Sequence, residues 1–213
     1  MRPTWKHAVG ATSSRGMTKP KLFFALLLAA ILLACGPEER QPELAGLDGL
    51  LLRDLDGREL LLGEQLDSLN VLYFFAPECP LSENYCLSAN LLQAKTAGRA
   101  VKHLVVVPGS YYSAGAVDSF RRQFDLKTPI FRDTSWAVSR ALAARVTPEV
   151  FIFTNDQKLL YRGAIDNWVF ALGKKRQRIT EFYADTVVMA ALQGRPLEAG
   201  STRAIGCTIE IPD

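Results

Sequence analysis

An apolar run over residues 70–76 (NVLYFFA) is the feature that most constrains the fold of this chain. A run without polar alternation fits a strand that is buried on both faces, as in sheets covered by helices on each side. From Pro80 to about Ala97 the apolar residues recur at three- and four-residue spacing, which is typical of an amphipathic helix. A buried strand that leads directly into a helix predicts an α/β domain.

The rest of the chain continues this alternation of strands and helices. The predicted strands are Leu50–Arg53, Glu59–Leu62, Val101–Pro108, Thr128–Phe131, Glu149–Thr154 and Lys158–Arg162, and the predicted helices are Ala114–Phe124, Ser135–Ala144 and Thr180–Gln193. An Asp-Gly pair between the first two strands is typical of a hairpin turn. The hairpins add antiparallel edges, so we expect a mixed sheet.

The N-terminal segment has the pattern of an export signal. Lys19 and Lys21 precede thirteen apolar residues, Leu22–Ala34, which are too few to span a bilayer comfortably but suit the core of a signal peptide. The run ends in Leu-Leu-Ala-Cys, which resembles the lipobox of bacterial lipoproteins. That resemblance implies cleavage before Cys35 and acylation of its thiol. An uncleaved anchor and a secretory signal with an incidental cysteine are the alternatives.

These features predict a division of the chain into three parts. Residues 1–35 form the signal peptide, with Met17 as a candidate start, and residues 36–47 are polar with two prolines and form a flexible tether. Residues 48–213 form the domain and its tail. We expect the mature protein in the cell envelope, anchored by lipid to a bacterial membrane and facing the periplasm or the exterior.

The charge balance excludes nucleic acid as a partner. The formal net charge is +3, but five of the 25 basic residues and none of the 22 acidic ones precede Cys35, so the exported part is close to neutral. Such a balance offers no basic surface for phosphates. The sequence also indicates no cofactor and no set of metal ligands, so we expect none.

Cys79 lies between a buried strand and the start of a helix, a position that favours a reactive thiol. The unsatisfied N–H groups and the positive dipole at a helix N-terminus favour the thiolate over the thiol. Pro80 suits the first helical position, because its missing N–H costs nothing there. The alternative is a small residue buried in the core.

Two stretches resemble the thioredoxin fold. Residues 74–82 (FFAPECPLS) are similar to the active-site stretch of thioredoxins, which implies that Cys79 is the attacking cysteine and that Ser82 replaces the second one. Residues 146–153 resemble the loop and strand that carry the cis-proline of the fold. The resemblance implies a cis Thr147–Pro148 bond, with Thr147 offering backbone groups to an extended substrate.

The wider pattern is similar to a peroxiredoxin-like group of redoxins in the alkyl hydroperoxide reductase/thiol-specific antioxidant superfamily. The shared elements are C-P-x-S/A-x-x-Y at Cys79–Tyr85, T-P-E-x-x-x-F at Thr147–Phe153, Y-R-G-x-I-D at Tyr161–Asp166 and T-R-x-x-G-C-x-I at Thr202–Ile209. The resemblance runs from about residue 50 to residue 209. It implies an α/β thioredoxin-like three-layer sandwich with a mixed central sheet and an N-terminal β-hairpin extension. It also implies substrate contacts from Pro80, Ser82, Thr147 and Pro148.

The chain departs from these families at the second cysteine. The peroxidatic cysteine of peroxiredoxins aligns with Ser82, and a serine hydroxyl is not oxidised to a sulfenic acid at a useful rate, so the standard peroxidase site is absent. The C-x-x-C pair of thioredoxins is also absent, because Ser82 stands where the second cysteine of that pair would be. Cys86 lies about 10.5 Å from Cys79 along one helix, too far for a disulfide, and is expected in the core. We hypothesise that the tail folds back and sets Cys207 near Cys79, as a resolving thiol or a second ligand.

The sequence thus favours an extracytoplasmic oxidoreductase of the thiol-disulfide or antioxidant type, with Cys79 as nucleophile. Its partner would be a protein or a small thiol or disulfide. Two alternatives keep the same fold: a Cu(I)-handling protein that uses the soft thiolates of Cys79 and Cys207, and a redox-inert binding module.

Overall fold

The computed structural model describes residue 42 and residues 44–212. The predicted signal peptide, the lipidation site Cys35 and most of the predicted tether lie outside these residues. Within the described part of the chain, no helix is long and apolar enough to cross a membrane.

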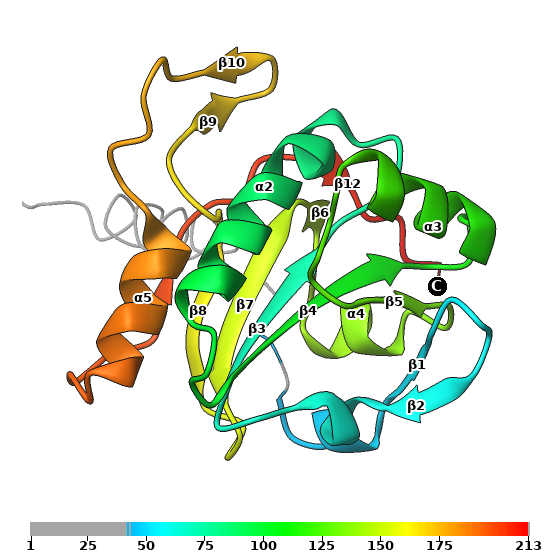
Figure 1. The fold of residues 1–213 in the computed structure, drawn as a ribbon, viewed down its shortest axis with the longest axis horizontal. Coiled ribbons are helices and arrows are strands. Elements are labelled where there is room, and N and C mark those ends of the chain that lie inside the picture. The colour runs from blue at the N-terminus through cyan, green and yellow to red at the C-terminus, as the bar shows by residue number, and fades with distance from the viewer. Residues whose placement is uncertain (1–41, 43, 213) are drawn as a thin grey trace, which may run out of the picture. The chain divides into compact units, whose positions relative to one another are not determined.

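The domain is built on an eight-stranded mixed sheet (Figure 1). In spatial order its strands are β11 (Gly200–Ser201), β8 (Leu159–Gly163), β7 (Glu149–Thr154), β3 (Leu69–Phe74), β4 (Val101–Pro108), β5 (Ile130–Asp133), β1 (Leu51–Arg53) and β2 (Glu59–Leu61). Strands β3, β4 and β5 are parallel, and β7 runs antiparallel to β3. The N-terminal hairpin β1–β2 extends the sheet beyond β5.

Both faces of the sheet are covered, as the apolar run in β3 predicts. Val71 and Tyr73 belong to a core cluster on one face, and Leu72 and Phe74 belong to a cluster on the other. Three helices, α2 (Pro80–Lys95), α3 (Ala114–Gln123) and α5 (Tyr183–Leu192), supply side chains to the first cluster. The helix α4 (Ala137–Ala141) and the short 3₁₀ helices η1 (Leu47–Gly49) and η2 (Leu62–Gln65) supply the second. The result is the expected three-layer α/β sandwich.

Several boundaries differ from the sequence-based expectation. The helix expected over residues 135–144 is only α4, because Trp136 and Ala143 adopt left-handed backbone conformations with φ of 57° and 49°. A helix cannot run through residues in that region. At the other end of the domain, Leu47 is buried and Leu44 packs against the same cluster, so the packed part begins slightly before residue 48.

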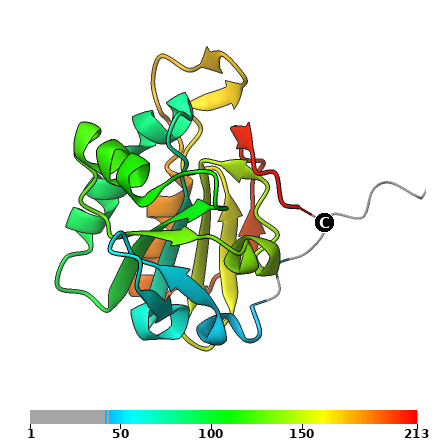
Figure 2. The ribbon, with the colours of Figure 1, turned by 90° about the vertical axis from the view of Figure 1, so that its right-hand side faces the viewer.

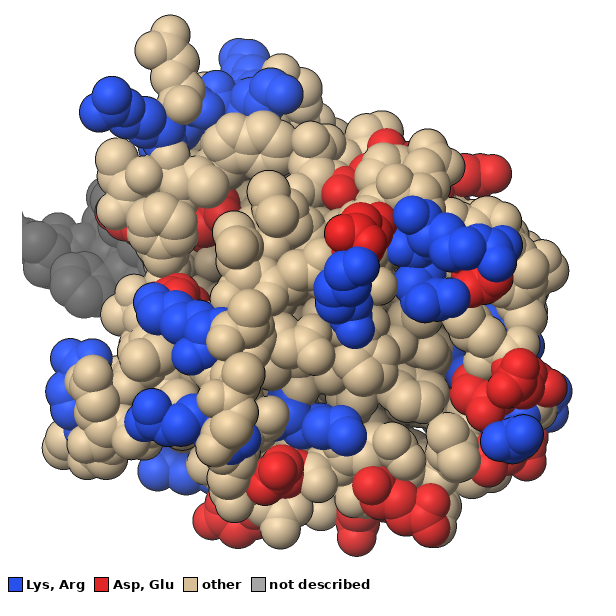
Figure 3. Space-filling model, viewed as in Figure 1, with Lys and Arg blue, Asp and Glu red and all other residues tan. Residues whose placement is uncertain are grey.

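A hairpin that has no clear signature in the sequence is formed by β9 (Val169–Ala171) and β10 (Lys174–Lys175). It projects from the rest of the domain in both ribbon views (Figures 1 and 2). Lys and Arg side chains gather over it in Figure 3. Lys175 Nζ lies 4.9 Å from the ring centroid of Trp168, so part of this charge is held against an aromatic face.

His103 on β4 is a buried polar residue, and both of its ring nitrogens have polar partners within the core. Its Nε2 lies 2.8 Å from Thr96 Oγ1, and its Nδ1 lies 3.4 Å from the hydroxyl of Tyr73. Burial disfavours the imidazolium and lowers the pKa of His103 to about 4. The residue is therefore a neutral structural group, as its place in a strand indicates.

This burial predicts a measurable pH dependence of stability. Because the pKa of His103 is about 4 in the folded state and 6.5 in the unfolded state, the unfolded state binds the extra proton between these values. We expect this residue to lower the free energy of unfolding by about 2 kcal/mol from pH 6.5 to pH 4.5. Urea unfolding of wild type and of His103→Gln at both pH values checks this; an equal change in the two proteins would contradict it.

Candidate active site

Cys79 lies at the turn between β3 and α2. It is the N-cap residue of α2, and Pro80 occupies the first helical position, as expected. The turn is tightened by Glu78, whose φ of 62° is left-handed, and the Cys79 N–H donates to the Ala76 carbonyl at 3.4 Å. The Cys79 carbonyl then accepts from the N–H of Glu83 at 3.1 Å. The thiol is therefore held at the positive end of a helix dipole.

The proline loop lies directly beside this thiol. The Thr147–Pro148 peptide bond is cis, which confirms the prediction from sequence. The loop begins with the short strand β6 (Val146–Thr147), and Cys79 Sγ lies 3.1 Å from the Thr147 carbonyl oxygen. Both residues are only 2% exposed.

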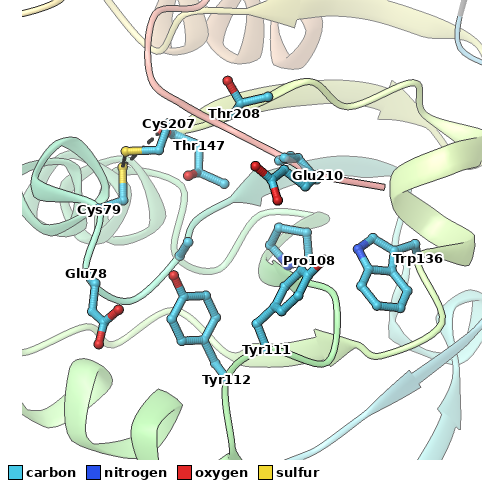
Figure 4. A pocket seen from close by; sticks show the side chains of 12 residues that line it. Glu78, Cys79, Pro108, Tyr111, Tyr112, Trp136, Thr147, Cys207, Thr208 and Glu210 are labelled. Atoms are coloured by element: carbon cyan, nitrogen blue, oxygen red, sulfur yellow. Dashed lines mark hydrogen bonds between the residues drawn. The ribbon is translucent and has the colours of Figure 1, made fainter. Parts of the chain in front are cut away.

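The C-terminal tail folds back over this loop and brings a second sulfur to the first. Its strand β12 (Cys207–Thr208) pairs antiparallel with β6, so that Cys207 stands opposite Thr147. The Sγ atoms of Cys79 and Cys207 face each other at 2.7 Å (Figure 4). A disulfide bond measures about 2.03–2.05 Å, so two free thiols separated by 128 residues lie close to bonding distance.

Close backbone packing fixes the tail in this position. A Cβ atom on Gly206 would lie 2.1 Å from the Thr147 carbonyl oxygen, so only glycine fits there. On the other side of the cysteine, the Ile209 N–H donates to the Arg145 carbonyl at 2.8 Å. The glycine in the G-C-x-I element therefore sets the approach of Cys207 to the loop.

The Y-R-G-x-I-D element anchors both the tail and the helix that carries Cys79. The Thr202 N–H donates to the Arg162 carbonyl at 3.1 Å, and a Cβ on Gly163 would lie 2.1 Å from the Thr202 carbonyl oxygen. Tyr85 of α2 donates its hydroxyl to Asp166 Oδ1 at 2.6 Å. Four motifs that are far apart in the sequence thus converge on one site.

The two sulfurs have opposite acid strengths. Burial by itself raises the pKa of the Cys79 thiol, but hydrogen bonds from the Cys207 thiol and from Ser82 outweigh burial and hold that pKa below its ordinary value. Desolvation of its sulfur and the neighbouring sulfur of Cys79 raise the pKa of Cys207 to about 12, although the residue as a whole is exposed. Cys79 is therefore the more acidic of the two thiols, and Cys207 is the thiol that donates to it.

Ser82 contributes from inside the protein. Its side chain is fully buried, and its Oγ accepts a hydrogen bond from the Ala76 N–H at 3.2 Å. Hydrogen bonding from the hydroxyl and from the backbone N–H of Ser82 lowers the pKa of Cys79. The residue that replaces a second cysteine thus stabilises the first.

Cys86, the third cysteine among the described residues, takes no part in this arrangement. Cys86 is buried on α2, and its Sγ donates to the Ser82 carbonyl at 3.4 Å. Burial and the charge of Glu83 raise the pKa of Cys86 to about 12, which leaves it an inert thiol. The structure therefore places Cys86 in the core, as its spacing from Cys79 indicates.

A pocket of about 230 Å³ opens beside the two sulfurs (Figure 4). It is lined by Ala76, Glu78, Cys79, Pro108, Tyr111, Tyr112, Trp136, Thr147, Cys207, Thr208, Ile209 and Glu210. Sequence reasoning missed its aromatic and acidic walls, because these residues come from loops and from the tail and follow no periodic pattern. Across residues 42 and 44–212, no group of three or more His, Cys, Asp or Glu side chains is arranged to hold a metal ion.

Comparisons with known proteins agree with this fold. No protein-family model and no curated protein matches the chain. A hypothetical protein from Sinorhizobium meliloti is similar with a TM-score of 0.65 and 22% identity over 75% of this chain and 89% of its own. The bacterioferritin comigratory protein of Xanthomonas campestris, described for alkyl peroxide reduction, has a TM-score of 0.54 and 17% identity over 76% and 99%.

A third similar structure is a secreted disulfide oxidoreductase from Mycobacterium tuberculosis that is homologous to E. coli DsbE. It has a TM-score of 0.50 and 14% identity over 70% of this chain and 98% of its own. At such identities the likeness concerns the fold, and the chain has a thioredoxin-like fold.

The unequal acid strengths predict the effect of removing one sulfur. We expect Cys207→Ala to raise the pKa of Cys79, because the thiolate loses a hydrogen-bond donor. Cys207→Ser keeps an O–H donor and should raise the pKa of Cys79 less. Thiolate absorbance at 240 nm, followed against pH, measures both variants. A Cys79 pKa that is the same in wild type and in Cys207→Ala would contradict the assignment.

The close approach at Gly206 predicts that a methyl group detaches the tail. We expect Gly206→Ala to increase the labelling rate of Cys79 by a small maleimide roughly tenfold or more, since each 1.4 kcal/mol of lost contact shifts opening tenfold. Gly49→Ala is the matched control, because a Cβ there meets nothing within 4 Å. Equal labelling rates in both variants would show that the tail does not cover the thiol.

Proposed function

We propose that this chain is a thiol-disulfide oxidoreductase in which Cys79 is the attacking cysteine and Cys207 the resolving one. The observation that carries the proposal is the 2.7 Å separation of their sulfurs. The opposite pKa shifts of the two thiols support these separate roles. The thiolate is the nucleophile in disulfide exchange, whereas a protonated thiol does not attack first.

The reaction follows from this division. The Cys79 thiolate attacks one sulfur of a partner disulfide, a mixed disulfide forms, and the first partner thiolate leaves and takes up a proton. The sulfur of Cys207 then attacks Cys79 within the mixed disulfide, and the second partner sulfur leaves with the proton that Cys207 gives up. The partner disulfide gains two electrons, and the Cys79–Cys207 pair loses them.

The other site residues act on the two sulfurs in this proposal. Ser82 stabilises the Cys79 thiolate from within, and Pro80 sets the start of the helix that carries it. Thr147 and Pro148 form the strand edge that positions the extended segment carrying Cys207. In each cycle the tail is thus the extended chain that the proline loop orients.

We also propose that the protein works outside the cytoplasm. A lipid on Cys35 would hold the domain at a bacterial membrane on the side of the periplasm or the exterior, where disulfide exchange is common. The secreted Mycobacterium tuberculosis oxidoreductase of similar fold supports this location. Because Ser82 stands at the peroxidatic position, disulfide exchange is favoured over standard peroxidase chemistry.

Thiol mapping tests the proposed pair. After mild oxidation and alkylation under non-reducing conditions, we expect one intramolecular disulfide between Cys79 and Cys207 and a free thiol at Cys86. The Cys86→Ser variant is the control and should form the same bridge, whereas Cys207→Ser should leave Cys79 free or joined to another molecule. Recovery of Cys79 and Cys207 as free thiols at every oxidant concentration would favour the redox-inert binding module instead.

A further inference from the structure

The tail closes the route that an extended polypeptide would use to reach the thiols. This inference rests on the proposed function. Strand β12 occupies the edge of β6, so the backbone of Thr147 already has a partner and a second strand cannot pair there. Gly206 packs its backbone against the same residue. While the tail is docked, Cys79 is only 2% exposed, and the pocket described above opens beside it.

The dimensions of this pocket limit what can enter. Its volume of about 230 Å³ is below the range of about 300–1,000 Å³ that is typical of sites for drug-sized ligands. Both sulfurs and the Thr147 side of the proline loop lie in its wall. A compact disulfide therefore fits between the walls and reaches Cys79, whereas an extended polypeptide finds the edge of β6 already occupied by β12.

The two charged residues that line the pocket have the same sign. Glu78 lines it beside Cys79, and Glu210 lines it from the tail (Figure 4), while no Lys or Arg side chain is among the lining residues. Arg132 hydrogen-bonds to the backbone carbonyl of Tyr112 from outside the lining. Burial and the negative charges of Glu78 and Cys79 raise the pKa of Tyr112, so the tyrosine experiences the same field.

Aromatic faces complete the wall opposite the sulfurs. Tyr111 and Trp136 meet edge to face with ring centroids 5.7 Å apart, and Tyr112 stands between Tyr111 and the thiols in Figure 4. Aromatic faces next to carboxylates attract cationic groups, both through the ring quadrupole and through charge.

We propose that this pocket admits low-molecular-weight disulfides and favours those with cationic ends over those with carboxylate ends. Cys79 attacks the bound disulfide and releases one small thiol, and Cys207 displaces the second as the protein disulfide forms. The products are two small thiols and the oxidised Cys79–Cys207 pair, so two electrons pass from the protein to the small molecule.

A series of three disulfides of similar size tests this selectivity. Cystamine carries two ammonium groups, bis(2-hydroxyethyl) disulfide is neutral, and 3,3′-dithiodipropionate carries two carboxylates. Second-order rate constants for oxidation of the reduced full-length protein are measured by stopped flow and divided by those for dithiothreitol, which corrects for intrinsic reactivity. At low ionic strength we expect the cystamine constant to exceed the dithiodipropionate constant by about tenfold. The ratio should fall towards one at about 1 M salt.

Charge-removing variants identify the source of the effect. Glu78→Gln and Glu210→Gln, singly and together, should lower the ratio of cystamine to dithiodipropionate rates. Glu64→Gln is the matched control, because Glu64 is exposed in η2, before β3, and is not among the lining residues. Equal normalised rates across the series, or a ratio that both glutamine variants leave unchanged, would overturn this inference.

The two proposals fail in different ways. If no disulfide in the series yields a Cys79–Cys207 bridge, the proposed function fails. If the bridge forms with all three but the normalised rates do not depend on charge, the proposed function stands and only the selectivity of the pocket is wrong.

Discussion

The site depends on the antiparallel pairing of the tail with the proline loop. This short contact between β12 and β6 sets Cys207 opposite Thr147, and the missing side chain of Gly206 allows the two backbones to meet. Without this pairing, Cys79 would have no second sulfur beside it and no tail to cover it. Such a contact closes a very long loop in the chain, which costs entropy. Thr202 and Ile209 secure the tail on either side and help to offset that cost.

The same contact determines the chemistry of the proposed function. A thioredoxin-like C-x-x-C pair places both sulfurs on one helix turn, but here the second sulfur arrives from the other end of the chain. Ser82 fills the vacated position and stabilises the thiolate that a helix N-terminus already favours. The proton stays on Cys207, whose pKa is raised to about 12. The difference in acidity between the two thiols is therefore produced by tertiary structure instead of local sequence.

The sequence predicted the layers of the fold better than the details of the site. Apolar runs such as that of β3 are buried on both faces, so strand order and helix coverage follow from pattern and resemblance together. The cis bond before Pro148 and the core position of Cys86 were also predictable from motif and spacing. The pocket wall was not, because Tyr111 and Glu210 lie in irregular segments whose positions depend on contacts distant in sequence. Short elements such as β12 carry too few residues for periodicity to reveal them.

The most direct test of the account is the redox equilibrium of the two thiols. The protein is equilibrated in a series of dithiothreitol buffers, the thiols are trapped with acid, and the fraction of the Cys79–Cys207 peptide is quantified by mass spectrometry. The account predicts one two-electron transition, with a tenfold change in the ratio of forms for about 30 mV, and Cys86 reduced throughout. Independent titration of the two cysteines, or bridges formed only between molecules, would contradict it.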